Sequence, residues 1–170
     1  MAALGRERGA QLIANEISPH RAKLVEDSVK ALDNVRVTQK DGTQFPLREG
    51  GYDRVLVDAP CTGLGALRRH PESRYRARNE TIPDITDLQA RLLNRALEVC
   101  RPGGLVIYAT CSPHPAETTF LVERVLKERK DGQLLDLTPV WDQLIDAEAW
   151  PQGLGCACLL YTSPSPRDCS

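Results

Sequence analysis

The sequence lacks several features that would assign the chain to a membrane, an extracellular space or a nucleic acid. The formal net charge is −1 at pH 7, so attraction to RNA or DNA must come from a local basic patch. No apolar run approaches the roughly 18 residues that a membrane span needs, and the residues after Met1 do not form a secretory signal. We therefore expect a cytoplasmic protein with reduced thiols and no membrane association.

Redox and metal motifs are missing as well. The six cysteines show no C-x-x-C spacing, which disfavours a thiol-disulfide enzyme. Cys156 and Cys158 lack the further ligands of a zinc site, so we expect no metal. The length of 170 residues is sufficient for one domain with a sizeable core.

Short apolar runs alternate with stretches of helical periodicity. The runs predict strands at residues 11–16, 35–38, 53–58, 105–111 and 134–137, and the periodic stretches predict helices at 2–8, 19–32, 84–100 and 115–129. A weaker helical pattern covers 140–149. This alternation predicts an α/β fold with a parallel, doubly wound, Rossmann-like sheet.

Polar and thiol side chains stand at the carboxyl ends of the predicted strands. Right-handed crossovers bring these ends to one edge of the sheet, where open α/β sheets bind their ligands. The residues that we expect to meet there are Glu16, Asp41, Asp58, Cys61 and Cys111.

The two acids nearest the amino terminus each have a functional and a structural interpretation. Glu16 can accept both hydroxyls of a ribose, or it can stabilise the start of the helix that follows it. Asp41, which precedes Gly42, is typical of a turn. The residues alone leave both interpretations of Glu16 open, whereas for Asp41 they favour the structural one.

The segment Asp58-Ala59-Pro60-Cys61 is more informative. Pro60 ends strand pairing, so Cys61 lies on the exit loop rather than in the core. Cys111 ends another strand just before a predicted helix, where the pKa of a thiol can fall and a nucleophile can form. Cys100, at the end of a predicted helix, is expected to be structural.

A basic cluster follows Cys61 in the sequence. Beside a reactive edge, such a cluster favours RNA or another polyanion, although charged loops are often only solvated. Its candidate RNA-binding residues are Arg68, Arg69, His70 and Arg74.

Two of these segments carry a resemblance to a known family. Residues 58–65, Asp-Ala-Pro-Cys-Thr-Gly-Leu-Gly, resemble motif IV of the RNA cytosine-C5 methyltransferases, the RsmB/Nol1/NSUN family, and residues 109–112, Ala-Thr-Cys-Ser, resemble its motif VI. The segments 68–71 and 102–104 fit between them in the family's order. The resemblance covers about residues 3–140 and is strongest to the bacterial branch that acts on 16S ribosomal RNA.

The resemblance implies an activity, a cofactor and a role for each site residue. Cys111 matches the nucleophile that adds to C6 of cytosine, so that C5 can attack the methyl group of S-adenosylmethionine. Asp58 matches the acid that hydrogen-bonds the ring near N3 and N4, and Cys61 the cysteine that assists proton removal and product release. Glu16 matches the ribose-binding acid and Asp41 the residue near the adenine amine. The implied partner is 16S ribosomal RNA, and the implied full-length protein is a monomer.

The chain also departs from the family's pattern. The family's motif I, of the type Asp-x-x-x-x-Pro-Gly-Gly-Lys-Thr, should precede residue 1, so we expect a fragment whose sheet lacks its first, central strand and its last strands. We expect residues 1–150 to be a partial catalytic domain that is nearly inactive alone. Residues 151–170 resemble a translated sequencing adapter and not a protein family. The alternative hypothesis is a non-catalytic RNA-binding fragment with the same fold.

Overall fold

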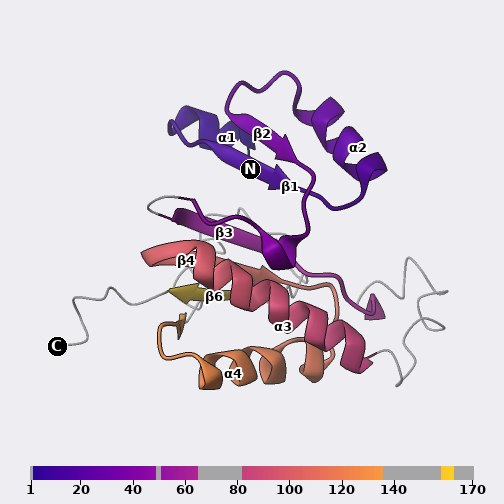
Figure 1. Cartoon of the computed structure of the whole chain (residues 1–170), viewed down its shortest axis with the longest axis vertical. Helices are drawn as coiled ribbons and strands as arrows, with labels where there is room; N and C mark the ends of the chain where they lie inside the picture. The colour runs from indigo at the N-terminus through magenta and orange to yellow at the C-terminus, as the bar shows by residue number, and fades with distance from the viewer. Residues whose placement is uncertain (1, 49–50, 65–81, 136–157, 163–170) are drawn as a thin grey trace, which may run out of the picture. The chain divides into compact units, whose positions relative to one another are not determined.

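The computed structural model describes residues 2–48, 51–64, 82–135 and 158–162, without the side chains of residues 4 and 158–162. The chain divides into two compact units, Met1–Pro46 and Leu47–Ser170 (Figure 1). The two units are described here one after the other.

The first unit is built on a pair of parallel strands. Its elements are α1 (Ala2–Glu7), β1 (Leu12–Asn15), α2 (Pro19–Val29), β2 (Val35–Thr38) and the 3-10 turn η1 (Gly42–Gln44). β1 and β2 pair in parallel from Leu12 opposite Val35 to Asn15 opposite Thr38. The buried Asn34 side chain donates to the carbonyl oxygens of Ala2 and Ala10, each at 3.1 Å, and so ties α1 to the start of β1.

The second unit is a four-stranded sheet in the order β3-β4-β6-β5. Its strands are β3 (Tyr52–Asp58), β4 (Cys100–Ala109), β5 (Gln133–Leu135) and β6 (Cys158–Thr162), and its helices are α3 (Ile82–Val99), η4 (Pro115–Glu117) and α4 (Thr119–Glu128). β3 and β4 are parallel, whereas β6 runs antiparallel to both β4 and β5.

The core of this unit lies between the sheet and the helices α3 and α4, which run side by side against it (Figure 1). Apolar residues at helical spacing on α3 and α4 meet alternate residues of β4, which is what an amphipathic helix packed on a sheet requires. The buried side chains at the centre are Leu93, Leu97, Val106, Tyr108, Leu121, Val122 and Val125.

Most of the predicted elements are confirmed, and the differences lie at their ends. β4 begins at Cys100, so this residue is a buried strand residue opposite Tyr52 and does not end a helix. β4 ends at Ala109, which leaves Cys111 on the loop beyond the strand. The helix expected at 115–129 is interrupted at Thr118, whose ψ of −102° is not helical.

Two further expectations concern the extent of the sheet. Within the described residues, β1 pairs only with β2 and β3 only with β4, which is consistent with the partial sheet expected from the sequence. Residues 158–162, which the sequence analysis placed outside the catalytic domain, form β6 along the open edge of β4. The predicted helix at 140–149 lies outside the described residues.

The close approach of β3 to β4 at their first residues depends on Gly51. Gly51 and Gly103 both have positive φ, 73° and 72°, but only Gly51 faces backbone, since an added Cβ would lie 2.8 Å from the N and Cα atoms of Arg101. Gly103 has open space, with its nearest neighbour at 3.7 Å.

We expect Gly103→Ala to cost about 1–2 kcal/mol from φ alone, and Gly51→Ala to cost clearly more. Urea unfolding followed by circular dichroism measures both, and equal losses would contradict the close approach.

Candidate active site

The carboxyl ends of β3 and β4 lie next to each other. Asp58 is opposite Ala109 in the parallel register, and the Ala59 N–H donates to the Ala109 carbonyl oxygen at 2.8 Å, one residue beyond the end of β3. Both chains then leave the sheet as loops, with Pro60 preventing further pairing on the β3 side. Cys61 and Cys111 therefore lie on neighbouring loops, just beyond the ends of β3 and β4.

The two thiols lie close enough for Cys61 to be the first cause of the raised pKa of Cys111. Cys61 is half-buried and Cys111 is exposed. The residues that follow them also touch, since Thr62 Oγ1 lies 3.3 Å from Ser112 Oγ. The charge of Asp58 acts on Cys111 as well, so the structure brings together all three residues predicted to be catalytic.

The pKa of Cys111 is raised, to about 11. The first cause is the hydrogen bond to Cys61, followed by burial and by repulsion from Cys61 and Asp58. The sequence-based expectation that a following helix would lower this pKa is wrong. The next element is a three-residue 3-10 turn that begins only at Pro115, and such a short turn has almost no dipole to stabilise a thiolate.

A buried carboxylate behind the two thiols was missed by the sequence analysis. Glu117 is fully buried and accepts four hydrogen bonds. Thr62 donates twice, from N to Oε2 at 3.0 Å and from Oγ1 to Oε1 at 2.6 Å. Ser112 Oγ donates to Oε1 at 2.6 Å, and Gln89 Nε2 donates to Oε2 at 3.1 Å.

These donors keep Glu117 ionised. Burial acts to raise the pKa of this carboxyl, but the hydrogen bonds from Ser112, Thr62 and Gln89 outweigh burial and hold the pKa below its ordinary value. Tyr108 OH donates to the Glu117 carbonyl oxygen at 3.0 Å, and burial together with the nearby Glu117 charge raises the pKa of Tyr108. No periodic pattern marks Glu117. The sequence signal is the pair of hydroxyl residues that directly follow the two cysteines.

The predicted cofactor-binding acids of the first unit follow its two strands. Glu16 Oε1 accepts from the Ser18 N–H and from Arg21 Nη2, both at 2.9 Å, which holds the pKa of Glu16 below its ordinary value against the opposing effect of desolvation. Asp41 Oδ1 accepts from N and Oγ1 of Thr43, both at 2.8 Å, and caps η1. Both acids therefore fill the structural role considered for them.

The same two acids also fit an adenosine group. Ser18 N and Arg21 Nη2 donate to Oε1 of Glu16, and the side chain keeps 21% of its surface exposed, so its carboxylate can also accept hydrogen bonds from ribose hydroxyls. Glu16 and Asp41 follow adjacent parallel strands, the arrangement with which nucleotide-binding sheets hold a ribose and a base.

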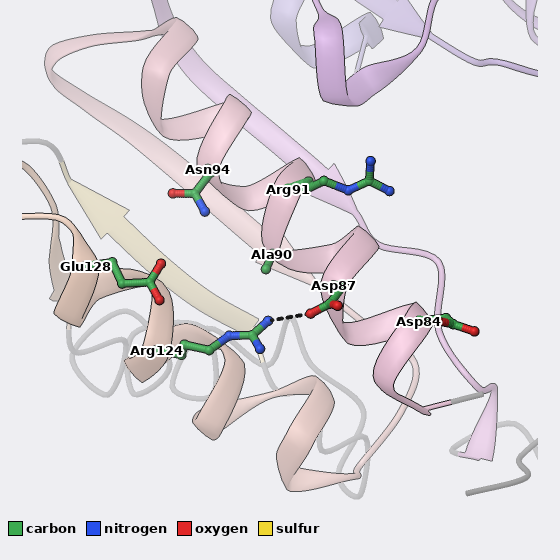
Figure 2. Close-up of a pocket in the computed structure, with 7 residues that line it drawn as sticks. All are labelled: Asp84, Asp87, Ala90, Arg91, Asn94, Arg124 and Glu128. Carbon is green, nitrogen blue, oxygen red and sulfur yellow. Dashed lines mark hydrogen bonds and ion pairs between the residues drawn. The ribbon is translucent and has the colours of Figure 1, made fainter. Parts of the chain in front are cut away.

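Other possible sites are less suited to chemistry. Figure 2 shows an open hollow between α3 and α4 that contains none of the predicted site residues. Its lining mixes both signs of charge, and Arg124 Nη2 lies 3.5 Å from Asp87 Oδ1, an exposed ion pair of a kind that contributes little. The predicted RNA-binding residues Arg68, Arg69, His70 and Arg74 lie outside the described residues. None of the described helices is long and apolar enough to cross a membrane.

Comparison with known proteins identifies the family. Residues 1–152 match the family model described as 16S rRNA methyltransferase RsmB/F. The chain belongs to this family. A methyltransferase of Mycobacterium tuberculosis is 43% identical over 162 residues, which are 91% of this chain and 35% of the relative. Ribosomal RNA small subunit methyltransferase B of Klebsiella pneumoniae is 38% identical over 129 residues, 74% of this chain and 30% of the relative.

A solved structure agrees with this assignment. NSun6 from Pyrococcus horikoshii, determined with SFG, superimposes with a TM-score of 0.64 at 26% identity over 74% of this chain and 32% of that chain. The fold is therefore the predicted Rossmann-like fold of the S-adenosylmethionine-dependent RNA methyltransferases. The chain spans about a third of the length of the curated relatives.

The contact between the two thiols predicts how a substitution changes the pKa of Cys111. Cys61→Ala removes the first cause of the raised pKa, so we expect the value to fall from about 11 toward 9. The pKa of Cys111 is measured from the pH dependence of its alkylation by iodoacetamide, which peptide mass spectrometry follows. Cys100→Ala is the control, because it removes a thiol in the core. An unchanged midpoint in Cys61→Ala would contradict the contact.

The lowered pKa of Glu117 predicts a loss of stability in acid. Its hydrogen bonds stabilise the fold above the unfolded value of 4.5 and are lost as the pH falls through the lower, folded value. At pH 7 we expect Glu117→Gln to lower the free energy of unfolding by about 3 kcal/mol, because buried donors lose a charged acceptor. Urea titrations from neutral to acid pH should show this difference shrinking below pH 4.5. A constant difference would mean that Glu117 is not ionised.

Proposed function

We propose that the chain is the catalytic segment of an enzyme that transfers a methyl group from S-adenosylmethionine to C5 of a cytosine in 16S ribosomal RNA. The observation that carries this proposal is that Cys61 and Cys111 follow the adjoining ends of two parallel strands, with Asp58 beside them, and that both Cys61 and Asp58 act on the pKa of Cys111. A pair of thiols can divide attack and release between them, which transient covalent catalysis requires.

In the first step, the sulfur of Cys111 forms a bond to C6 of the cytosine ring. The proton that leaves Cys111 passes to ring N3 by way of Asp58, which hydrogen-bonds the ring near N3 and N4, so the added electron density reaches C5. Because the Cys111 pKa of about 11 disfavours a free thiolate at neutral pH, coupling thiol attack to this proton transfer suits the site better than a preformed anion.

In the second step, C5 acquires the methyl group and must lose its proton. Bound S-adenosylmethionine supplies that methyl group as an electrophile. Removal of the C5 proton, which Cys61 assists, re-forms the C5–C6 double bond and breaks the bond from C6 to Cys111. The N3 proton then returns through Asp58 to the Cys111 sulfur. Glu16 and Asp41 would hold the adenosine part of the cofactor through its ribose hydroxyls and its adenine amine.

The substrate base must leave its stack to reach these thiols, which requires RNA contacts beside the site. We assign these contacts to Arg68, Arg69, His70 and Arg74, the basic cluster that directly follows the Cys61 loop. The chain contains no Pro-Gly-Gly-Lys loop to hold the methionine end of the cofactor, so we expect little activity from it alone.

The role of Cys61 in release predicts a trapped intermediate. Cys61→Ala, in a full-length protein that contains this segment, should accumulate a covalent RNA adduct that survives denaturing electrophoresis. The further change Cys111→Ala should abolish the adduct, because Cys111 forms the bond. A Cys100→Ala variant is the control and should accumulate none.

Absence of the adduct in Cys61→Ala, with RNA binding intact, would overturn the enzymatic proposal in favour of an RNA-binding module. Arg68→Ala combined with Arg69→Ala weakens RNA binding under either hypothesis and shows that the assay reports binding by this cluster. The position of the adduct within 16S ribosomal RNA then identifies the target cytosine.

A further inference from the structure

We propose that Glu117 is a positioning residue that holds the two thiol-bearing loops at contact distance, an inference that rests on the function proposed for Cys61 and Cys111. Glu117 touches neither thiol in the hydrogen bonds of the described residues. It acts instead through the residue that directly follows each cysteine.

On the β3 side, Glu117 fixes the loop immediately after Cys61. Both the backbone N–H and the hydroxyl of Thr62 donate to its carboxylate, at 3.0 and 2.6 Å. Gln89, on the rigid helix α3, donates to the same carboxylate at 3.1 Å and to the Pro60 carbonyl oxygen at 2.7 Å. Cys61 is therefore held on both sides, through Pro60 and through Thr62.

On the β4 side, Glu117 fixes the loop immediately after Cys111. Ser112 Oγ donates to Oε1 at 2.6 Å, the same oxygen that accepts from the Thr62 hydroxyl. Thr62 and Ser112 are both nearly completely buried, at 4% and 3% exposure. One carboxylate oxygen thus joins the two loops, and the distance between the thiols follows from that shared acceptor.

The charge at this position is difficult to explain by stability alone. Among the described residues no cation contacts Glu117, and apolar side chains commonly replace buried charges without loss of stability. A glutamine could keep these partners only if the Thr62 and Ser112 hydroxyls turned to accept from its amide group, and the resulting hydrogen bonds would be neutral and weaker. Only a carboxylate accepts from all four donors as they stand. Four donors from two loops and a helix require both oxygens.

The experiment measures the coupling between the thiols with and without Glu117. The readout is the change in Cys111 alkylation rate at pH 8 that Cys61→Ala produces, with iodoacetamide as the probe. With Glu117 present, we expect an increase of roughly ten- to a hundredfold as the Cys111 pKa falls. In Glu117→Ala, which removes all four carboxylate contacts, we expect Cys111 to react fast already, with less than about a twofold further change on Cys61→Ala.

Two further variants separate positioning from mere stabilisation. Tyr108→Phe removes the hydrogen bond to the Glu117 carbonyl oxygen but leaves its carboxylate contacts, so it should lower stability and preserve the coupling. Ser112→Ala removes one carboxylate contact from the Cys111 loop and should weaken the coupling, which provides the test if Glu117→Ala does not fold.

A full coupling in Glu117→Ala, or in Ser112→Ala if the former is unfolded, would overturn the positioning role. The measurement uses neither RNA nor cofactor. If the coupling depends on Glu117 but Cys61→Ala forms no RNA adduct, only the proposed function is rejected. If the adduct forms but the coupling does not depend on Glu117, only this inference is rejected.

Discussion

The carboxylate of Glu117 is the point at which the loops beyond β3 and β4 and the helix α3 meet. A fully buried anion is tolerated only when its hydrogen-bond capacity is filled, and here Thr62, Ser112 and Gln89 fill it. That requirement fixes the two loops after the sheet, because each must present a donor to the same group. The arrangement of the thiols follows from it.

Because Cys61 lies beside it, Cys111 has a pKa that differs from that of most nucleophilic cysteines. A nucleophile is commonly activated by a lowered pKa, yet the environment of Cys111 raises its pKa to about 11. A resting site of this kind is protected from indiscriminate alkylation and oxidation. In the mechanism that we propose, thiol attack is coupled to proton transfer at the substrate ring, which would give Asp58 a direct part in activation and not only in binding.

The sequence predicted the strands and helices well because their apolar periodicity is strong, and it predicted Asp58, Cys61 and Cys111 as neighbours because parallel strands end at one edge. It predicted the direction of the Cys111 pKa wrongly, since that direction depends on Cys61 and Asp58 across the sheet and not on the following residues. Glu117 was missed because two of its three partner residues, Thr62 and Gln89, are distant in sequence. Thr62 is 55 residues away, and no local pattern reports such a contact.

The central claim is that these residues methylate C5 of cytosine. The chain spans about a third of its curated relatives, so the decisive measurement uses a full-length protein that contains this segment, 16S ribosomal RNA and labelled S-adenosylmethionine. Nucleosides from the product RNA are then separated by chromatography and mass spectrometry. The account predicts label in 5-methylcytidine, which Cys111→Ala abolishes. Label in any other nucleoside, or activity that survives Cys111→Ala, would contradict it.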